Sequence, residues 1–282
     1  MRFYVNSSSN HQTLDAFRTG DVLSGSCVDS KVELEPYDLG IIVEVFGHTM
    51  RYYDIHAHLA DLRILPQVDN ILTESRKQGV CGILVNAARQ SEWQQILDLC
   101  DNSLVYGALG VHPLFLDQTA AELSESLQQA LQAHEHICAI GEIGLDFYHG
   151  RQDRDLQIEA FTAQLQLAHD MDLPAILHNR KSWAEFFAVL RNLDSPEIRG
   201  VCHHFCGSRE IARQALDKGL YLSFCGPLTY TNARRLKDAA RYAPLDRILT
   251  ETDTPDLPCA RFHGGQSYPY HVREIVRELS TL

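Results

Sequence analysis

Short apolar runs alternate with longer amphipathic segments from residue 51 onward. The apolar runs have the length of strands, whereas segments such as 154–170 carry their apolar residues at helical spacing. Strands are therefore expected at 51–55, 81–85, 104–109, 137–141, 174–177, 199–202, 220–223 and 247–250. Helices are expected between them, near 66–78, 90–100, 119–133, 154–170, 181–193, 208–217 and 232–242.

Residues that favour helix ends support these segments. Asp117, Ser182 and Ser208 are suited to helix N-caps, because their side-chain oxygens accept hydrogen bonds from the unpaired backbone N–H groups of the first turn. Gly79 and Gly219 are suited to the positions that follow a helix.

This alternation predicts an α/β fold, specifically a (β/α)8 TIM barrel, whose chemistry lies at the C-terminal ends of the strands. The alternative is an open doubly wound sheet. Against it, no Gly-x-Gly-x-x-Gly motif follows the early strands.

Residues 1–49 lack the alternation of strand-like and helical segments that the rest of the chain shows. Segments 2–5, 31–34 and 40–46 are strand-like and are separated by turn-forming residues. We expect a β-rich extension over 1–49, a fusion remnant or misplaced start, and a catalytic barrel over 50–282. Within the extension, residues 21–25 and 31–38 weakly resemble the tail of the C-terminal β-domain of some β-galactosidases.

Composition narrows the class of protein. The chain has 282 residues, 45% of them hydrophobic, which suffices for one large barrel core. A net charge of −12 argues against a broad basic face for nucleic acid, but it leaves open a nuclease whose metal ions meet the phosphates. No apolar run reaches 18 residues, so no membrane span is expected. The eight cysteines form no Cys-x-x-Cys motif, which favours buried free thiols in a reducing cytoplasm.

Polar side chains follow most of the expected strands at their C-terminal ends. His56 and His58 come first, and alternation along a strand directs both side chains to one face. Taken singly, each such residue has a simpler explanation as a hydrogen-bonded structural group. The other strand-end segments are 110–113, 141–146, 178–180, 203–205 and 251–256.

Together these segments bring several histidines and at least two carboxylates to one barrel face. Imidazole nitrogens and carboxylate oxygens suit Zn, Mn, Mg or similar divalent ions, and an acidic bridge allows two of them. The sequence therefore predicts a site for two divalent ions.

Six motifs, in this order, resemble the TatD family of metal-dependent deoxyribonucleases. The resemblance extends from residue 51 to about residue 270 and implies a TIM barrel of the amidohydrolase-like superfamily. It also implies metal-dependent hydrolysis of phosphodiesters. The motifs are His56-x-His58, Gly110-Val111-His112-Pro113, Gly141-Glu142-Ile143-Gly144-Leu145-Asp146, Leu177-His178-x-Arg180, His203-x-Phe205-x-Gly207-Ser208 and Glu251-Thr252-Asp253-x-Pro255.

The resemblance also implies roles for individual residues. His112 and Arg180 match polar groups that face the substrate, and Glu251 matches an acid that supports the site. The ligands that it implies are His56, His58, Glu142 and Asp253 for the first ion, with Glu142 bridging, and His178 and His203 for the second.

Hydrolysis of a phosphodiester requires chemical roles that the same residues can fill. A metal ion makes hydroxide available at neutral pH, and Asp253 is expected to accept the proton of the attacking water. Arg180 offers a forked donor for phosphate, although a salt bridge to a nearby carboxylate is the simpler alternative. We therefore expect Asp253, Glu142, His112 and Glu251 to be catalytic, and Arg180 and His112 to bind substrate.

Two further groups lie near the expected site. Strand alternation predicts that His203 and His204 point to opposite faces, so that only one of them reaches the barrel mouth, and the family pattern selects His203. Phe147, Tyr148 and Phe205 could stack on bases, although ordinary packing is the simpler expectation for each.

The C-terminal part departs from the family pattern. The family continues with a turn and two helices, but here the chain stops at Leu282, inside or just after the first of them. We therefore expect the barrel to lack its last C-terminal helix and to expose apolar surface on its first and last strands.

The expected function is divalent-metal-dependent cleavage of DNA by metal-activated water, with 3′–5′ exonuclease action as the finer expectation. DNA is the expected partner, as substrate, and no protein partner is expected. One alternative is an amidohydrolase-type enzyme acting on small esters, lactones or amides, although no strand-end lysine is found to bridge its metals. The other is a truncated, noncatalytic protein that binds metal or nucleic acid.

Overall fold

The strands that the structure describes form one sheet in which spatial order follows chain order. The computed structural model describes residues 43–46, 49–132, 135–150, 153–193 and 198–282. Strands β2 to β9 are each parallel to their neighbours, and β1 pairs antiparallel with the start of β2. The strands are β1 (Val43–Phe46), β2 (Thr49–Ala57), β3 (Val80–Asn86), β4 (Val105–Leu109), β5 (Ile137–Asp146), β6 (Ala175–Arg180), β7 (Gly200–Cys202), β8 (Tyr221–Phe224) and β9 (Ile248–Thr250).

The sheet curls until the segment after β9 meets β2. The Asp253 N–H donates to the carbonyl of His56 at 2.9 Å, and the His58 N–H donates to the carbonyl of Thr254 at 2.7 Å. The eight parallel strands thus form a nearly closed barrel, joined at the end that carries the strand termini. The predicted TIM barrel is confirmed, and the open doubly wound alternative is wrong.

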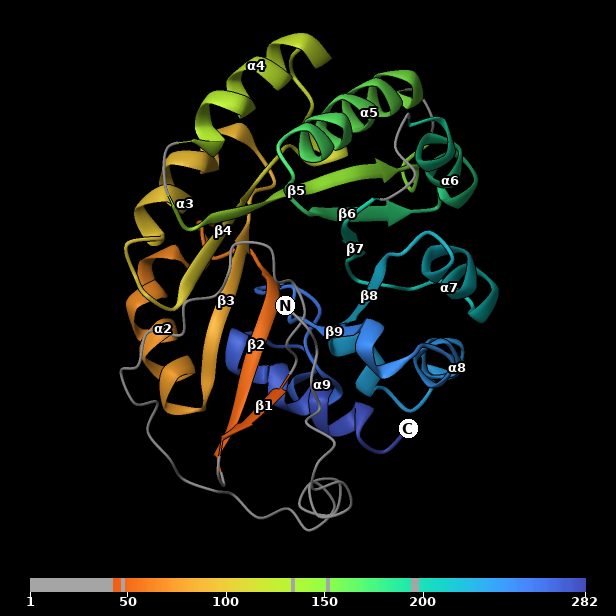
Figure 1. Ribbon diagram of the computed structural model, residues 1–282. Helices are drawn as coiled ribbons and strands as arrows, with labels where there is room; N and C mark the ends of the chain where they lie inside the picture. Colours follow the sequence, from red (N-terminus) through yellow and green to blue (C-terminus); the bar gives the residue numbers. More distant parts are fainter. Residues whose placement is uncertain (1–42, 47–48, 133–134, 151–152, 194–197) are drawn as a thin grey trace.

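Each barrel strand is followed by a helix, and the helices form a ring around the strands (Figure 1). This is the arrangement that alternating strand and helix periods favour, because each helix buries its apolar stripe against the sheet. The helices are α2 (Val68–Lys77), α3 (Trp93–Leu99), α4 (Ala120–Leu131), α5 (Arg154–Asp170), α6 (Trp183–Asn192), α7 (Arg209–Leu216), α8 (Arg234–Tyr242) and α9 (Val272–Leu279).

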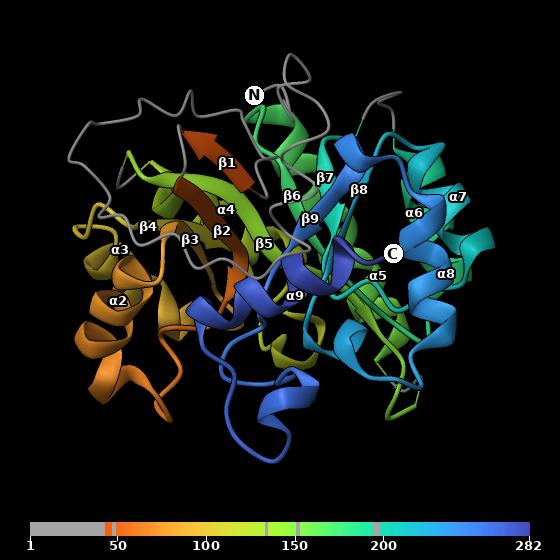
Figure 2. The same cartoon turned by 90° about the horizontal axis from the view of Figure 1, so that it is seen from below.

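Helix α9 corrects the expectation of exposed apolar strand surface. It lies between α2 and α8 and packs against β2 and β9 (Figure 2). Its residues Val272, Ile275 and Val276 are buried. The first and last barrel strands are therefore covered, and the described residues contain one helix after each of the eight barrel strands.

The predicted helix ends were partly right. Ser208 is the N-cap of α7 and accepts a hydrogen bond from the Ile211 N–H at 3.4 Å. Ser182 also precedes its helix, but its hydroxyl donates to the carbonyl of Leu145 instead of capping. The prediction for Asp117 is wrong, because Thr119 caps α4. There the capping box with a glutamate three residues later satisfies two otherwise unpaired N–H groups.

Two apolar layers hold the barrel together. The larger layer lies between the strands and the helices. The smaller one fills the barrel itself with one buried side chain from each of several strands, which is how small barrels avoid a central pore. This inner layer consists of Ile55, Leu84, Ala108, Ala139, Ile176, Val201 and Leu249.

Most of the predicted N-terminal extension, residues 1–42 with its expected strands at 2–5 and 31–34, lies outside the described residues. Of the expected strand at 40–46, the structure describes β1 (Val43–Phe46). None of the helices in the described ranges has the length and apolar composition that a membrane span requires.

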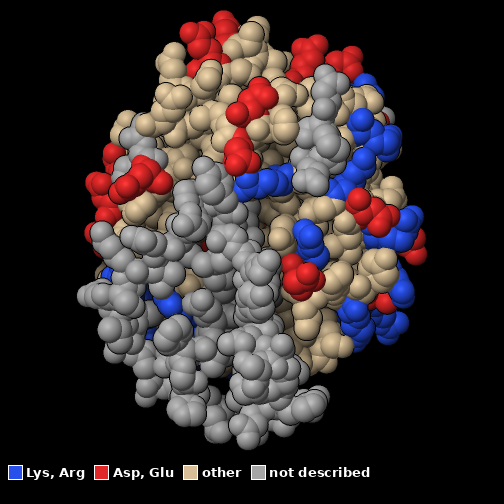
Figure 3. Space-filling model, in the orientation of Figure 1, with Lys and Arg blue, Asp and Glu red and all other residues tan. Residues whose placement is uncertain are grey.

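Charge is unevenly distributed over the surface (Figure 3). On the face shown, lysine and arginine side chains gather over α7 and α8, whereas aspartate and glutamate gather over α3 and α4. The strong negative net charge of the chain therefore does not exclude a local basic flank.

Candidate metal centre

His56 and His58 converge as strand alternation predicts. Their Nε2 atoms lie 3.1 Å apart at the C-terminal end of β2. The Nδ1–H of His58 donates to the carbonyl of Asn86, at the end of β3, at 3.0 Å. This bond fixes the ring and leaves the Nε2 lone pair of His58 directed into the site, the arrangement typical of metal-binding histidines.

Glu142 lies at the centre of the site, with one carboxylate oxygen for each of two histidine pairs. Its Oε2 atom is 3.5 Å from Nε2 of both His56 and His58. Its Oε1 atom is 2.6 Å from Nδ1 of His178 and 2.7 Å from Nε2 of His203. A carboxylate between two nitrogen pairs is suited to bridge two cations.

Asp253 joins the first of these pairs from the segment after β9. Its Oδ1 atom lies 3.4 Å from Nε2 of His58 and 3.7 Å from Nε2 of His56. Asp253 has a φ of 54°, which is unfavourable for a residue with a side chain and costs about 1–3 kcal/mol. Such strain is typical of functional positions, because the surrounding fold must impose it.

The spacing of these atoms fits divalent ions. Neighbouring ligands about 2.0–2.2 Å from one ion are about 2.8–3.6 Å apart in octahedral or tetrahedral geometry. The ligand atoms of His56, His58, Glu142 and Asp253 are separated by 3.1 to 3.7 Å where they face each other. A second group of potential ligands, Glu142, His178 and His203, meets on the other side of the Glu142 carboxylate.

The electrostatics of the site also favour bound cations. Burial alone would raise the pKa of Glu142, but the neighbouring histidines, His203 foremost, hold it well below its usual value. Burial would lower the pKa of His58, but Asp253 and Glu142 raise it to about 9. The buried carboxylates thus stay negatively charged and stabilise positive charge beside them, which divalent ions would supply.

His112 lies beside the centre as a hydrogen-bond donor. Its Nδ1 accepts from the Leu114 N–H at 3.1 Å, so the proton of the neutral ring is on Nε2. Nε2 lies 3.6 Å from Oε1 of Glu142. Burial lowers the pKa of His112 to about 3, which keeps the ring neutral.

Asp146 is a site residue that motif reading did not single out. Its Oδ2 atom accepts from Nε2 of His178 at 3.3 Å, which turns Nδ1 of that ring toward Glu142. Arg180 approaches the same carboxylate oxygen at 3.9 Å. The signal was present, since Asp146 closes the motif that begins with Gly141, but its partner is 32 residues away.

Gly144 makes this arrangement possible. A Cβ atom at this position would lie 2.0 Å from the carbonyl oxygen of His178. The absence of a side chain therefore allows β5 and β6 to approach closely where Glu142 and His178 meet.

His203 lies beside Glu251, and the position of His204 differs from the prediction. Nδ1 of His203 lies 3.6 Å from Oε1 of Glu251, which is fully buried. The His204 N–H donates to the same oxygen of Glu251. Strand alternation does not apply here, because β7 ends at Cys202 and His204 has a φ of 42°. His204 consequently lies close to the site, with its ring centroid 6.1 Å from that of His203.

The aromatic residues near the rim separate into two kinds. Phe147 and Phe205 are buried and belong to the core, as the simpler expectation held. Tyr148 is 53% exposed, so packing does not explain it. All cysteines among the described residues are free, and none belongs to a potential metal group there.

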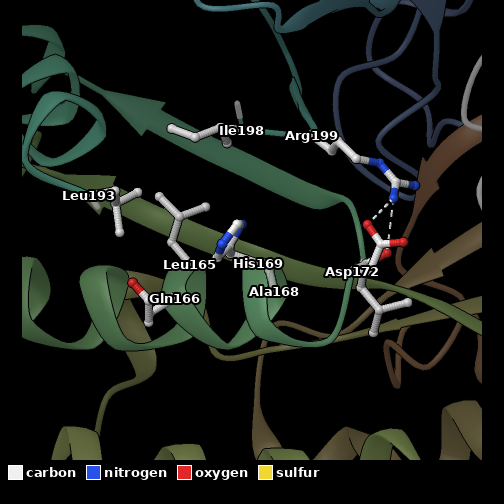
Figure 4. Close-up of a pocket in the computed structure, with 9 residues that line it drawn as sticks. Leu165, Gln166, Ala168, His169, Asp172, Leu193, Ile198 and Arg199 are labelled. Carbon is white, nitrogen blue, oxygen red and sulfur yellow. Dashed lines mark hydrogen bonds and ion pairs between the residues drawn. The ribbon is translucent and has the colours of Figure 1, made fainter. Parts of the chain in front are cut away.

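A separate hollow lies away from this centre (Figure 4). Its lining includes Leu165 and His169 of α5, and an ion pair between Arg199 and Asp172 borders it. Asp172 and Arg199 precede β6 and β7, so the hollow lies at the N-terminal ends of the strands, opposite the site. It therefore does not belong to the metal centre.

Comparison with known proteins agrees with this geometry. The family model described as TatD related DNase matches residues 53–282. The uncharacterized metal-dependent hydrolase YcfH of Escherichia coli is 35% identical over 233 residues, which cover 81% of this chain and 87% of that protein. YabD of Bacillus subtilis, also an uncharacterized metal-dependent hydrolase, is 32% identical over 232 residues, 82% of this chain and 90% of the relative.

A solved structure supports the same assignment. The crystal structure of YjjV, a TatD homolog from Escherichia coli, has a TM-score of 0.76 at 32% identity, and the match covers 82% of this chain and 90% of that one. The expected likeness of residues 1–49 to a β-galactosidase finds no support, since these matches concern the barrel. The chain belongs to the TatD-related DNase family and is a metal-dependent hydrolase with a candidate binuclear site.

Proposed function

We propose that this protein is a deoxyribonuclease that hydrolyses phosphodiester bonds of DNA. The family match supports hydrolysis, and the groups around the centre support an anionic substrate. The observation that carries the proposal is the position of Glu142, which is shared by two histidine pairs and has Asp253 on one side and the His112 and Arg180 donors on the other.

The substrate phosphate is held by donors of this chain. His112 presents a neutral Nε2–H toward the centre and donates to a nonbridging phosphate oxygen. Arg180 is half exposed at the mouth and offers a charged, planar pair of N–H groups. The basic flank over α7 and α8 adds local attraction for a polyanion (Figure 3).

Asp253 accepts the proton of the attacking water. The water oxygen bonds to phosphorus, the bond between phosphorus and the leaving oxygen breaks, and a second proton reaches that leaving oxygen from solvent. Divalent ions held by His56, His58, Glu142, Asp253, His178 and His203 would supply Lewis acidity and a lowered pKa for water. Asp146 keeps the ring of His178 in place, and the Glu251 carboxylate lies beside the ring of His203.

Substrate class tests the proposal. The purified, metal-loaded chain is offered a labelled single-stranded oligodeoxynucleotide, bis(p-nitrophenyl) phosphate, an aromatic lactone and a dipeptide. We expect hydrolysis of the two phosphodiesters. Turnover of the lactone or the dipeptide without cleavage of either phosphodiester would contradict the proposal.

A matched pair of variants tests the proton acceptor. Asp253→Asn should reduce DNA cleavage about 10²–10⁴-fold, as expected for loss of a general base. Asp155→Asn, which changes an exposed carboxylate on α5, should leave cleavage unchanged. The ion content of the Asp253→Asn protein, measured in the same preparation, separates loss of the base from loss of a ligand.

A further inference from the structure

Two aromatic side chains stand on the loops around the barrel mouth with much of their surface exposed. Phe115, in the short helix η4 (Pro113–Phe115) after β4, is 36% exposed, and Tyr148, after β5, is 53% exposed. Large exposed aromatic rings near a catalytic centre are typical of binding surfaces, because such rings lose their contact with water only when a ligand covers them.

Each of these rings is covered on one face by an arginine from a neighbouring loop. The Cζ atom of Arg180, at the end of β6, lies 3.6 Å from the centroid of the Tyr148 ring. The Cζ atom of Arg89, after β3, lies 3.9 Å from the centroid of the Phe115 ring. Stacking orients a guanidinium group and leaves its N–H edges available to an anion.

Both arginine–aromatic pairs lie on the same side of the metal centre. The Phe115 ring centroid is 5.6 Å from that of His112, whose Nε2 atom is 3.6 Å from Glu142. The Tyr148 N–H donates to Asp146 at 2.8 Å, and Asp146 holds His178. The two pairs therefore border the position in which a phosphate would meet the His112 donor.

We infer that Arg89–Phe115 and Arg180–Tyr148 form a two-part clamp for the nucleotides that flank the cleaved phosphodiester. The inference rests on the proposed function. Unpaired bases stack on the exposed ring surface, and the arginines pair with the adjacent phosphates. Because the faces of bases within a duplex are already covered, the clamp selects single-stranded DNA.

Base-free substrates separate this role from a structural one. The substrates are a ten-residue oligothymidylate, an oligomer of the same length with abasic residues throughout, and bis(p-nitrophenyl) phosphate. Tyr148→Ala and Phe115→Ala should each raise KM for oligothymidylate about 10-fold, with kcat little changed. Loss of either ring also frees the arginine that stacks on it, so hydrolysis of the abasic oligomer and of bis(p-nitrophenyl) phosphate should fall as well, but by a smaller factor.

Conservative variants and a control sharpen the comparison. Tyr148→Phe keeps the ring and should behave as the wild type. Arg89→Lys keeps the charge but not the planar stack, and should raise KM for both oligomers. Leu245→Ala removes a side chain that is 73% exposed before β9, at the opposite end of the barrel, and should change nothing.

Binding of fluorescent oligothymidylate, measured in EDTA, tests the clamp without requiring turnover. A larger loss of binding by Tyr148→Ala for oligothymidylate than for the abasic oligomer supports it. This holds even if no phosphodiester is hydrolysed, an outcome that would contradict only the proposed function. Equal losses for every substrate, or no loss for oligothymidylate, would overturn the clamp.

Discussion

The Nε2 atoms of His56 and His58 lie 3.1 Å apart, and both are 3.5 Å from the same oxygen of Glu142. Two ring nitrogens and a carboxylate so close together, in a buried position, are held best by a cation between them. The relationship between these two histidines therefore makes a direct prediction about metal content.

His58→Gln should remove one of the bound ions. Loss of a ligand should weaken the first site by more than the roughly 10–100-fold that follows removal of an outer partner. The ion content of dialysed protein, measured by mass spectrometry, should fall by one ion per chain. His169→Gln changes an exposed histidine on α5 and should retain the full content. An unchanged content in His58→Gln would show that His58 is not a ligand.

Asp146→Asn should reduce the rate of phosphodiester cleavage about 10–100-fold, although Asp146 touches neither Glu142 nor Asp253. The carboxylate accepts from Nε2 of His178 and so sets the direction of Nδ1. The amide presents a donor or a weaker acceptor at that point. Steady-state kinetics compare it with Asp155→Asn, whose carboxylate is 87% exposed. Equal rates for the two variants would refute a positioning role.

Leu249→Ala should lower the free energy of unfolding by about 2–5 kcal/mol. Leu249 is fully buried in the inner layer of the barrel, where a cavity cannot close easily. Leu245→Ala, at a side chain that is 73% exposed, should stay within about 0.5 kcal/mol of the wild type. Urea titration of both variants gives the comparison, and similar midpoints would contradict the packing described for the barrel.

His271 should make stability depend on pH. Burial and the nearby Arg261 lower the pKa of His271 to about 4, and its Nδ1 accepts from the Tyr268 N–H. The unfolded chain binds this proton near pH 6.5, so the free energy of unfolding falls as the pH drops from about 6.5 toward 4.

His271→Gln removes the titrating group and keeps an acceptor for Tyr268. Between pH 7 and pH 5 the wild type should therefore lose about 2 kcal/mol more stability than the variant. Unfolding curves at the two pH values measure the difference, and parallel losses would exclude His271 as the source.

The fold was largely predictable because strand and helix periods repeat locally along the chain. All eight barrel strands were expected close to their observed positions. The expected strand 137–141 was too short, since β5 continues to Asp146 and carries Glu142 within it. The predicted orientation of the His204 side chain was wrong, because the strand ends at Cys202 and strand alternation does not extend to His204.

The site was less completely predictable because its supporting contacts join distant segments. The carbonyl of Asn86 that orients His58 belongs to a different strand and leaves no motif. The same holds for the Arg89–Phe115 stack, whose partners are 26 positions apart in the sequence on separate loops. Ligand residue types recur in recognisable motifs, whereas the groups that orient them depend on the closed barrel.

Metal-dependent cleavage of DNA tests the central claim most directly. The chain is stripped with EDTA, dialysed, and titrated with Mn, Zn or Mg while cleavage of a labelled single strand and bound ion are measured together. We expect no cleavage by the stripped chain, and full cleavage at about two bound ions per chain. Cleavage that persists in the stripped chain, or its absence from a folded chain with both ions bound, would contradict the central claim.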